Sequence, residues 1–285
     1  MRWRGRRQSD NIEDRRGLRV GRGVGIGGIG LVAVYLISMY FGVDPSVLLG
    51  GIETSQVGPA SGETEPYNET APEAERREQV AVVLADTEDV WRAAFAQMGG
   101  SYREPKLVLF VGAVDSGCGF AEAAVGPFYC PADERVFIDL SFFDDLERLG
   151  AGGDFPRAYV IAHEIGHHVQ NLLGTSGRVQ DLRGRIDAAE GNQLSVRLEL
   201  QADCFAGLWA RQVEKVAAVL EPGDVEEALG AASAIGDDRL QRRAGGQVVP
   251  DSFTHGTSAQ RVGWFRRGFD AGTIEACDSF RETEL

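Results

Sequence analysis

Three of the four histidines in this chain fall within the six residues His163-Glu164-Ile165-Gly166-His167-His168. The residues before them, 159–162, are apolar, and the pattern from about 156 to 173 predicts a helix buried in a core. Residues four apart lie on one face of a helix, so His163 and His167 can present their imidazoles to a single metal ion. The stretch therefore predicts a metal site on a buried helix.

Glu164 follows the first of these histidines, about 100° around the helix. A carboxylate there lies beside the metal, where it can hold and deprotonate a zinc-bound water. His168 points about 100° away from His167, so we expect it on the helix surface or behind a ligand. One alternative stays open at this point, namely two core histidines on a purely structural helix.

A catalytic zinc usually has three protein ligands and one open position. Glu199 is the best candidate for the third ligand, because Glu199 and Asp203 share a helix face within the largely apolar stretch 198–208. Embedded carboxylates need a partner. We expect Glu199 to reach the zinc and Asp203 to accept the outer N–H of a ligand histidine, which fixes the tautomer. The alternative is a pair of solvated surface acids.

His255, the remaining histidine, comes just before a helix that Thr257 and Gln260 open with a capping box. A donor in such a loop can stabilise the oxyanion formed when hydroxide attacks a carbonyl. Arg261 follows in the same helix and can orient this histidine or pair with a carboxylate of the metal site. A surface histidine and an ordinary helix arginine are the alternative.

The N-terminal region predicts a membrane anchor. Residues 24–43 carry no charge, and as a helix they span about 30 Å, the thickness of a bilayer core. Of the two flanks of this stretch, only the N-terminal one carries arginines, which predicts that the N-terminus lies in the cytoplasm. The predicted parts are a basic cytoplasmic arm (1–23), a single transmembrane helix, a flexible linker (44–76) and an extracytoplasmic domain (77–285). A cleaved signal peptide is disfavoured because no A-x-A-like site follows. A buried globular helix is the third possibility.

The net charge of the chain indicates which classes of binding partner to expect. The formal net charge is −14, and the part after the arginine-rich start is more acidic still. Such a surface repels phosphate backbones, so we expect no nucleic-acid partner. The lipid bilayer, contacted through the N-terminal helix, is the expected partner of the basic start.

Four cysteines lie beyond the predicted membrane helix, where an even count suggests two disulfides. Three pairings are possible. We prefer Cys118–Cys130, which closes a short loop, and Cys204–Cys277, which ties the C-terminal region to a core helix. Four buried free thiols are the alternative.

The order of the remaining elements predicts the fold class. Residues 78–98 read as an amphipathic helix, and residues 106–114 and 135–140 have the β-branched and aromatic content of strands. Further helices are expected at about 195–220, 225–235 and 257–271. A helix, a small sheet and then several helices indicate an α+β domain rather than a doubly wound one.

Five stretches make a family resemblance visible. Residues 126–146, 159–174, 194–210, 226–241 and 249–272 resemble the bacterial putative neutral zinc metallopeptidase family, and the likeness covers nearly the whole chain. The resemblance implies a zincin-like domain in which zinc binds His163, His167 and Glu199, with Glu164 as general base and Asp203 behind a ligand. The segment from Thr254 to Arg261 is similar to the post-ligand histidine segment of membrane-associated zincins, which implies that His255 is a transition-state donor.

The expected function is that of a membrane-anchored zinc endopeptidase with one catalytic Zn²⁺ and a peptide or protein substrate. An envelope scaffold that uses zinc for stability alone is the alternative from another class. A zinc hydrolase that cleaves other amides, such as peptide cross-links of the cell wall, shares the same chemistry.

Overall fold

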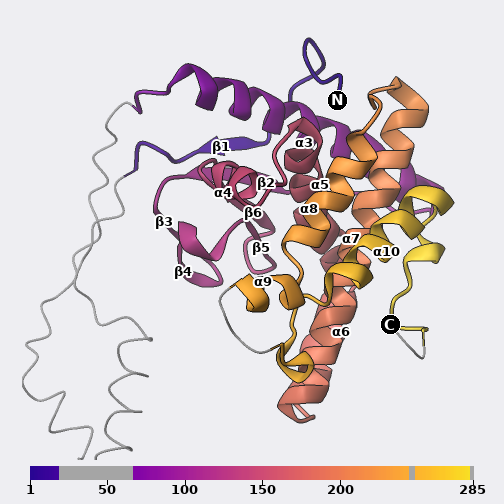
Figure 1. Ribbon diagram of the computed structural model, residues 1–285. Helices are drawn as coiled ribbons and strands as arrows, with labels where there is room; N and C mark the ends of the chain where they lie inside the picture. Colours follow the sequence, from indigo (N-terminus) through magenta and orange to yellow (C-terminus); the bar gives the residue numbers. More distant parts are fainter. Residues whose placement is uncertain (19–66, 244–247, 283–285) are drawn as a thin grey trace, which may run out of the picture. The chain divides into compact units, whose positions relative to one another are not determined.

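The computed structural model describes residues 1–18, 67–243 and 248–282 (Figure 1). The strands are β1 (Ile12–Asp14), β2 (Lys106–Phe110), β3 (Ala113–Ser116), β4 (Gly119–Glu122), β5 (Phe128–Cys130) and β6 (Arg135–Asp139). The helices are α3 (Ala71–Gln97), α4 (Phe142–Arg148), α5 (Asp154–Leu172), α6 (Thr175–Arg183), α7 (Ala188–Ala217), α8 (Asp224–Ala234), α9 (Asp237–Arg243) and α10 (Ser258–Ala271). Short 3₁₀ turns are η1 (Ala123–Val125), η2 (Pro250–Ser252) and η3 (Glu275–Cys277). The predicted α+β class is confirmed.

The larger sheet has the strand order β1-β2-β6-β5. Strands β1, β2 and β6 are parallel, whereas β5 runs antiparallel to β6 and forms one edge. Strands β2 and β6 are almost entirely buried apolar runs, as expected for strands covered on both faces. Strands β3 and β4 form a separate hairpin.

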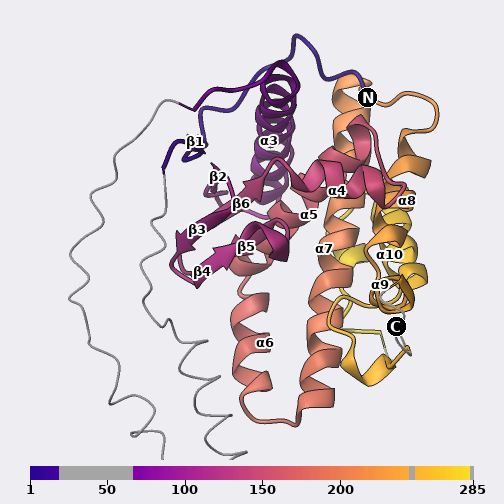
Figure 2. The same cartoon turned by 60° about the vertical axis from the view of Figure 1, so that its left-hand side comes forward.

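Helix α5, which carries the histidine motif, lies at the centre of the helical layer. It contacts β5 and β6 of the sheet, and it also contacts α3, α7 and α8 (Figure 2). Helix α10 packs against both α7 and α8. Most of the residues of α5 are buried, including His163 and Glu164, so the motif stands inside the core rather than on a loop.

Two glycines let these helices approach closely. A Cβ atom at Gly268 of α10 would lie 1.9 Å from the carbonyl oxygen of Cys204 in α7. A Cβ atom at Gly166 of α5 would lie 3.1 Å from the backbone of Ala202 in α7. The absence of side chains at these crossings brings α5, α7 and α10 near enough for their polar side chains to meet.

The Gly268→Ala variant tests this close approach. Its methyl group has no room against Cys204, so we expect a loss of about 1–3 kcal/mol in the free energy of unfolding. Gly263→Ala on the same helix is the matched control, because its Cβ atom would meet nothing within 4 Å. Chemical denaturation of both variants measures the difference. Equal stabilities for the two would contradict the tight α7–α10 crossing.

Both predicted disulfides are present. Cys118 and Cys130 are joined with a Cα–Cα distance of 5.8 Å and tie the β3–β4 hairpin to edge strand β5. Cys204 and Cys277 are joined with a Cα–Cα distance of 5.4 Å and tie α7 to η3 in the C-terminal region. The second disulfide therefore fastens the end of the described chain to the helix that carries Glu199.

The predicted basic arm is wrong for residues 1–16, which are part of the folded domain. Strand β1 extends the sheet beside β2, and the side chains of Met1 and Trp3 are buried. The arginines of this segment have the local pattern of a membrane flank, which is why the sequence predicts one there. The structure instead gives several of them partners in α3.

These partners are acids that the fold buries. Arg6 Nη2 lies 2.8 Å from Asp86 Oδ1, and Arg7 Nη1 lies 3.1 Å from Glu88 Oε2. Asp86 and Glu88 are only 6% and 2% exposed, so each carboxylate needs a compensating partner. The arm supplies those partners, so it packs against the folded domain.

The start of the domain also differs from the prediction. Helix α3 begins at Ala71, where Thr70 and Glu73 form a capping box, so the predicted boundary at residue 77 falls inside a helix. The predicted membrane helix (24–43) and the predicted linker up to residue 66 lie outside the described residues. Within the part of the chain that is described, no helix is both long and apolar enough to cross a bilayer.

A zero-length cross-link tests whether the arm packs against the domain in cells. Arg7 Nη2 lies 2.9 Å from Asp89 Oδ1, and the chain has only two lysines, Lys106 and Lys215. In an Arg7→Lys variant, we expect carbodiimide treatment of native membranes to join the new amine to Asp89, detected by mass spectrometry of the digest. The wild-type chain, with a guanidinium at this position, is the control. A bond that forms only after solubilisation in detergent, or never forms, contradicts the docked arm.

Candidate metal centre

His163, His167 and Glu199 come together between α5 and α7, and one ligand atom from each lies within 4.8 Å of the other two. His163 Nε2 is 3.2 Å from Glu199 Oε2, and His167 Nε2 is 3.4 Å from Glu199 Oε1. The structure thus assembles the three predicted ligands. Two imidazoles and one carboxylate are the donor set of a catalytic zinc site with an open position.

The other nitrogen of each imidazole is already engaged. His163 Nδ1 lies 2.9 Å from Asp203 Oδ1, and His167 Nδ1 lies 2.9 Å from Gln170 Oε1. Both Nδ1 atoms face these acceptors, so both Nε2 atoms face Glu199. Such outer partners fix the tautomer of a ligand histidine and raise its basicity, which is the arrangement that a bound metal requires. The residues present therefore fit a zinc ion.

Asp203 and Arg261 form a buried ion pair behind His163. Arg261 Nε donates to Asp203 Oδ2 at 2.8 Å, and Arg261 Nη2 donates to Asp203 Oδ1 at 2.9 Å. Burial alone would raise the pKa of Asp203, but Arg261 and His163 outweigh burial and lower it. The pair keeps the carboxylate ionised without exposing it to water. Arg261 thus contacts a metal-site carboxylate, one of the two roles that the sequence predicts for it.

Tyr159 completes this cluster and is absent from the sequence prediction. Its hydroxyl donates to Asp203 Oδ1 and accepts from Arg261 Nη2 at 3.1 Å. Tyr159 stands four residues before His163 on the same helix, so the spacing that pairs the two histidines also places this tyrosine beside them. That spacing is a signal that sequence reasoning can use.

Charge is concentrated around the ligands in a way that suits metal binding. Burial opposes protonation of His163, yet the neighbouring Asp203 and Glu199 carboxylates raise its pKa to about 10. Burial likewise acts to raise the pKa of Glu199, but His167 and His163 lower it below its usual range. Glu199 is therefore ionised, and the two imidazoles lie in a strongly cation-attracting site.

Glu164 stands apart from this network. Its side chain is buried, with the whole residue only 7% exposed, and it forms no hydrogen bond or ion pair with any described residue. A buried carboxylate without a protein partner is unusual, because desolvation of the charge is uncompensated. It lies one residue after His163 on a helix whose other polar side chains at the site are engaged. A free carboxylate beside the ligands is what a general base needs.

His168 is not at the helix surface, one of the two positions predicted for it. It is completely buried, with Nδ1 3.0 Å from the hydroxyl of Tyr129 and Nε2 2.6 Å from the Arg103 carbonyl oxygen. It faces away from the ligands and links α5 to edge strand β5. Burial lowers its pKa, so a neutral ring is favoured there.

His255 lies in the loop before α10, as predicted, and Asp237 holds that loop. Asp237 Oδ2 accepts the backbone N–H groups of Thr254, His255 and Gly256 at 2.8, 2.7 and 3.1 Å. Asp237 Oδ1 lies 3.2 Å from His255 Nδ1, and this contact raises the pKa of the imidazole, with the charge of Glu199 contributing. Half of the His255 side chain remains exposed. Asp237 itself is absent from the sequence prediction.

The Asp203→Asn variant tests the buried pair. It leaves the Arg261 guanidinium without a counter-charge, for which we expect a stability loss of about 3–5 kcal/mol. It also weakens the hold on His163, for which we expect zinc affinity to fall about 10–100-fold. Asp181→Asn on the exposed face of α6 is the control. Denaturation and competitive zinc titration give the two values, and wild-type zinc affinity in the folded variant would contradict the assignment.

Comparisons with known proteins agree with this geometry. The family model described as putative neutral zinc metallopeptidase matches residues 1–280, which include the arm and every residue of the site. The uncharacterized protein YpfJ of Escherichia coli K12 is 51% identical over 290 residues, covering 98% of this chain and 99% of its own. The uncharacterized protein Rv2575 of Mycobacterium tuberculosis H37Rv is 40% identical over 266 residues, covering 87% and 86%. No solved structure gives a significant match.

Proposed function

This chain belongs to the putative neutral zinc metallopeptidase family, and from that premise we propose that it is a zinc-dependent endopeptidase with a zincin-like catalytic domain. The observation that carries the proposal is the free carboxylate of Glu164 beside a two-histidine, one-glutamate ligand set. Zinc bound there supplies a Lewis acid that polarises the substrate carbonyl and acidifies water. A site built only for stability has no need of an unpaired, buried acid.

Glu164 is the proposed general base. Its carboxylate accepts a proton from the attacking water and later delivers that proton to the leaving amine, so one residue serves both halves of the reaction. The side chain is largely buried, and its place on α5 fixes its position. Ligands on α5 and α7 together set the place where the carbonyl of the substrate must lie.

His255 is the proposed donor to the oxyanion. Asp237 holds the loop through three backbone N–H groups and engages Nδ1, which leaves Nε2 directed away from the carboxylate. A protonated imidazole can donate from Nε2 to the developing negative charge. The contact with Asp237 raises the pKa of His255, which shifts the imidazole toward that protonated form.

Place of action is part of the proposal. Two disulfides support an oxidising, extracytoplasmic compartment for the domain, because such bonds persist there. The uncharged stretch 24–43 supports attachment to the lipid bilayer. Because the arm packs with the domain, both flanks of that stretch are proposed to lie on the side of the domain. Exposed peptide or protein chains in that compartment are the proposed substrates.

The Glu164→Gln variant tests the function. We expect the full-length purified chain to bind one zinc per molecule, measured by metal analysis, and to cleave a peptide library or casein. The variant should keep the zinc and lose at least about 100-fold in kcat/KM, because a general base is removed and no ligand is. Glu226→Gln, at an exposed position of α8, is the matched control. A variant that cleaves at the wild-type rate, or a zinc-loaded wild type that cleaves nothing, contradicts the proposal.

Variants of the His255 loop test the oxyanion donor. His255→Ala should lower kcat about 100-fold, the usual effect of removing one such donor, with little change in KM or zinc content. Asp237→Asn removes the charge that raises the pKa of His255, so the alkaline limb of the pH–kcat profile should move to lower pH. Steady-state kinetics across pH give both results. An unchanged kcat for His255→Ala rules out this role.

A further inference from the structure

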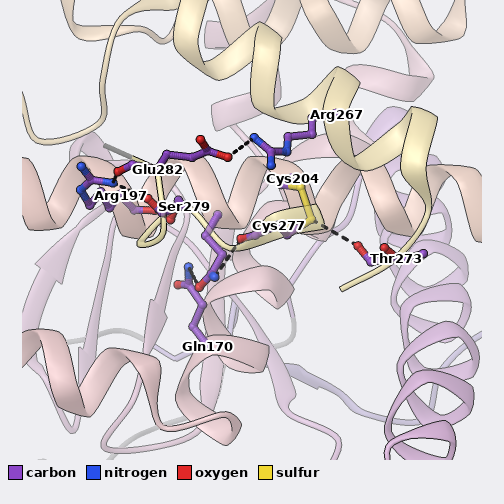
Figure 3. Close-up of a disulfide and its surroundings, with 9 residues drawn as sticks. Gln170, Arg197, Cys204, Arg267, Thr273, Cys277, Ser279 and Glu282 are labelled. Carbon is purple, nitrogen blue, oxygen red and sulfur yellow. Dashed lines mark hydrogen bonds and ion pairs between the residues drawn. A yellow bond between two sulfur atoms is a disulfide. The ribbon is translucent and has the colours of Figure 1, made fainter. Parts of the chain in front are cut away.

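A chain of side-chain amides connects the ligand His167 to the disulfide-bonded C-terminal segment. His167 Nδ1 lies 2.9 Å from Gln170 Oε1, and Gln170 Nε2 lies 3.2 Å from Gln201 Oε1. Gln201 Nε2 in turn donates to the carbonyl oxygen of Cys277 at 2.9 Å. Figure 3 shows Gln170 close to the segment that carries the Cys204–Cys277 disulfide.

The polarity of this chain is fixed at its far end. A backbone carbonyl can only accept, so Gln201 must present its NH₂ group to Cys277 and its oxygen to Gln170. Gln170 must then donate to Gln201 and turn its own oxygen toward His167. A second carbonyl gives the same result, because Gln170 Nε2 also donates to Leu198 O at 2.7 Å. Each link therefore has one permitted direction, and the last link requires a proton on Nδ1 of His167.

The same contacts tie together the two helices that carry the ligands. Gln170 belongs to α5, three residues after His167, and it reaches the backbone of α7 at Leu198, directly before Glu199. Gln170 is completely buried and Gln201 is 7% exposed, so water does not compete for these bonds. Cys277, at the end of the chain of bonds, is anchored to α7 by its disulfide to Cys204.

Further contacts hold the segment after Cys277 along α7. The buried Ser279 hydroxyl donates to the Arg197 carbonyl oxygen at 2.6 Å. The Arg197 guanidinium donates to the carbonyl oxygens of Ser279 and Glu282. Arg267 of α10 pairs with Glu282 at 2.8 Å. The Cys277 carbonyl that ends the amide chain thus lies between the disulfide on one side and the contacts of Ser279 and Glu282 on the other.

We propose that Gln170 and Gln201 are positioning residues that fix the Nδ1–H tautomer of His167 and its place relative to Glu199, with the disulfide-bonded C-terminal segment as their anchor. This inference rests on the proposed metal site. It adds a difference between the two ligand histidines, since His163 is backed by the Asp203 carboxylate and His167 by a neutral amide. Metal affinity, rather than peptide cleavage alone, is the property that the chain of bonds controls.

Zinc affinity of Gln170→Met provides the first measurement. Methionine keeps the approximate volume of glutamine but cannot accept from Nδ1, so we expect the zinc dissociation constant to rise about 10–100-fold in a chelator competition. Gln180→Met, at an exposed position of α6, is the control and should leave zinc affinity unchanged. Gln201→Met, which keeps the disulfide intact, should weaken zinc binding in the same direction but less. In the double variant the two effects should be less than additive, because both act on one chain of bonds.

A second readout separates positioning from a loss of general stability. The zinc-loaded wild type should show hydrogen-bonded imidazole Nδ1–H signals from both His163 and His167 in proton NMR. In Gln170→Met the His167 signal should disappear through exchange with water, while the His163 signal, held by Asp203, remains. Zinc affinity within twofold of the wild type and an intact His167 signal would overturn the proposal. Neither readout depends on cleavage, so a failure of the peptidase assignment is distinguishable from a failure of this one.

Discussion

The buried ion pair between Asp203 and Arg261 is the interaction on which the rest of the site depends. It joins α7 to α10 and, through Asp203, holds His163 and Tyr159 of α5. A buried charge is tolerated only when its partner and its hydrogen bonds are complete. The three helices must therefore meet in one arrangement, and the close crossings at Gly166 and Gly268 let them do so. That arrangement also places Glu199 opposite both imidazoles.

The polar residues of the metal site fall into two groups, those with a hydrogen-bond or ion-pair partner and one without. His163, His167 and Glu199 face one another, and the outer nitrogen of each imidazole is engaged by Asp203 or Gln170. Glu164 alone among these buried polar groups has no partner among the described residues. A fold that satisfies its other site carboxylates so completely leaves this one ready for proton transfer. The proposed hydrolase function rests on that contrast as well as on the sequence motif.

Much of the site could be predicted from the sequence because it obeys helical spacing. The two members of each pair are four residues apart, so one helix geometry identifies both His163 with His167 and Glu199 with Asp203. Tyr159 lies four residues before His163, and Gln170 lies three residues after His167, so both share the helix face of the histidines. Tyrosine and glutamine are not typical metal ligands, so their residue types do not indicate a metal site. Asp237 lies outside any such pattern, since it acts on a loop 18 residues away through backbone N–H groups. Contacts of that kind are set by tertiary packing alone.

The role of the N-terminal segment, in contrast, could not be predicted from the sequence. The arginines of residues 1–16 predict a membrane flank when only their own neighbourhood is considered. Their partners Asp86 and Glu88 lie about 80 positions later in α3, and nothing local to either segment indicates the pairing. Strand β1 is likewise too short to stand out from its surroundings. The family match from residue 1 agrees with an arm that belongs to the domain.

X-ray absorption spectroscopy of the zinc-loaded full-length protein reports the ligands of the metal without reference to activity. We expect one zinc with two imidazole nitrogens at about 2.0–2.1 Å, carboxylate oxygen at about 2.0–2.2 Å and no sulfur. Replacing His167 by alanine should lower the number of imidazole ligands from two to one. A spectrum with sulfur ligands, or one without imidazole scattering, would contradict a metal centre formed by His163, His167 and Glu199.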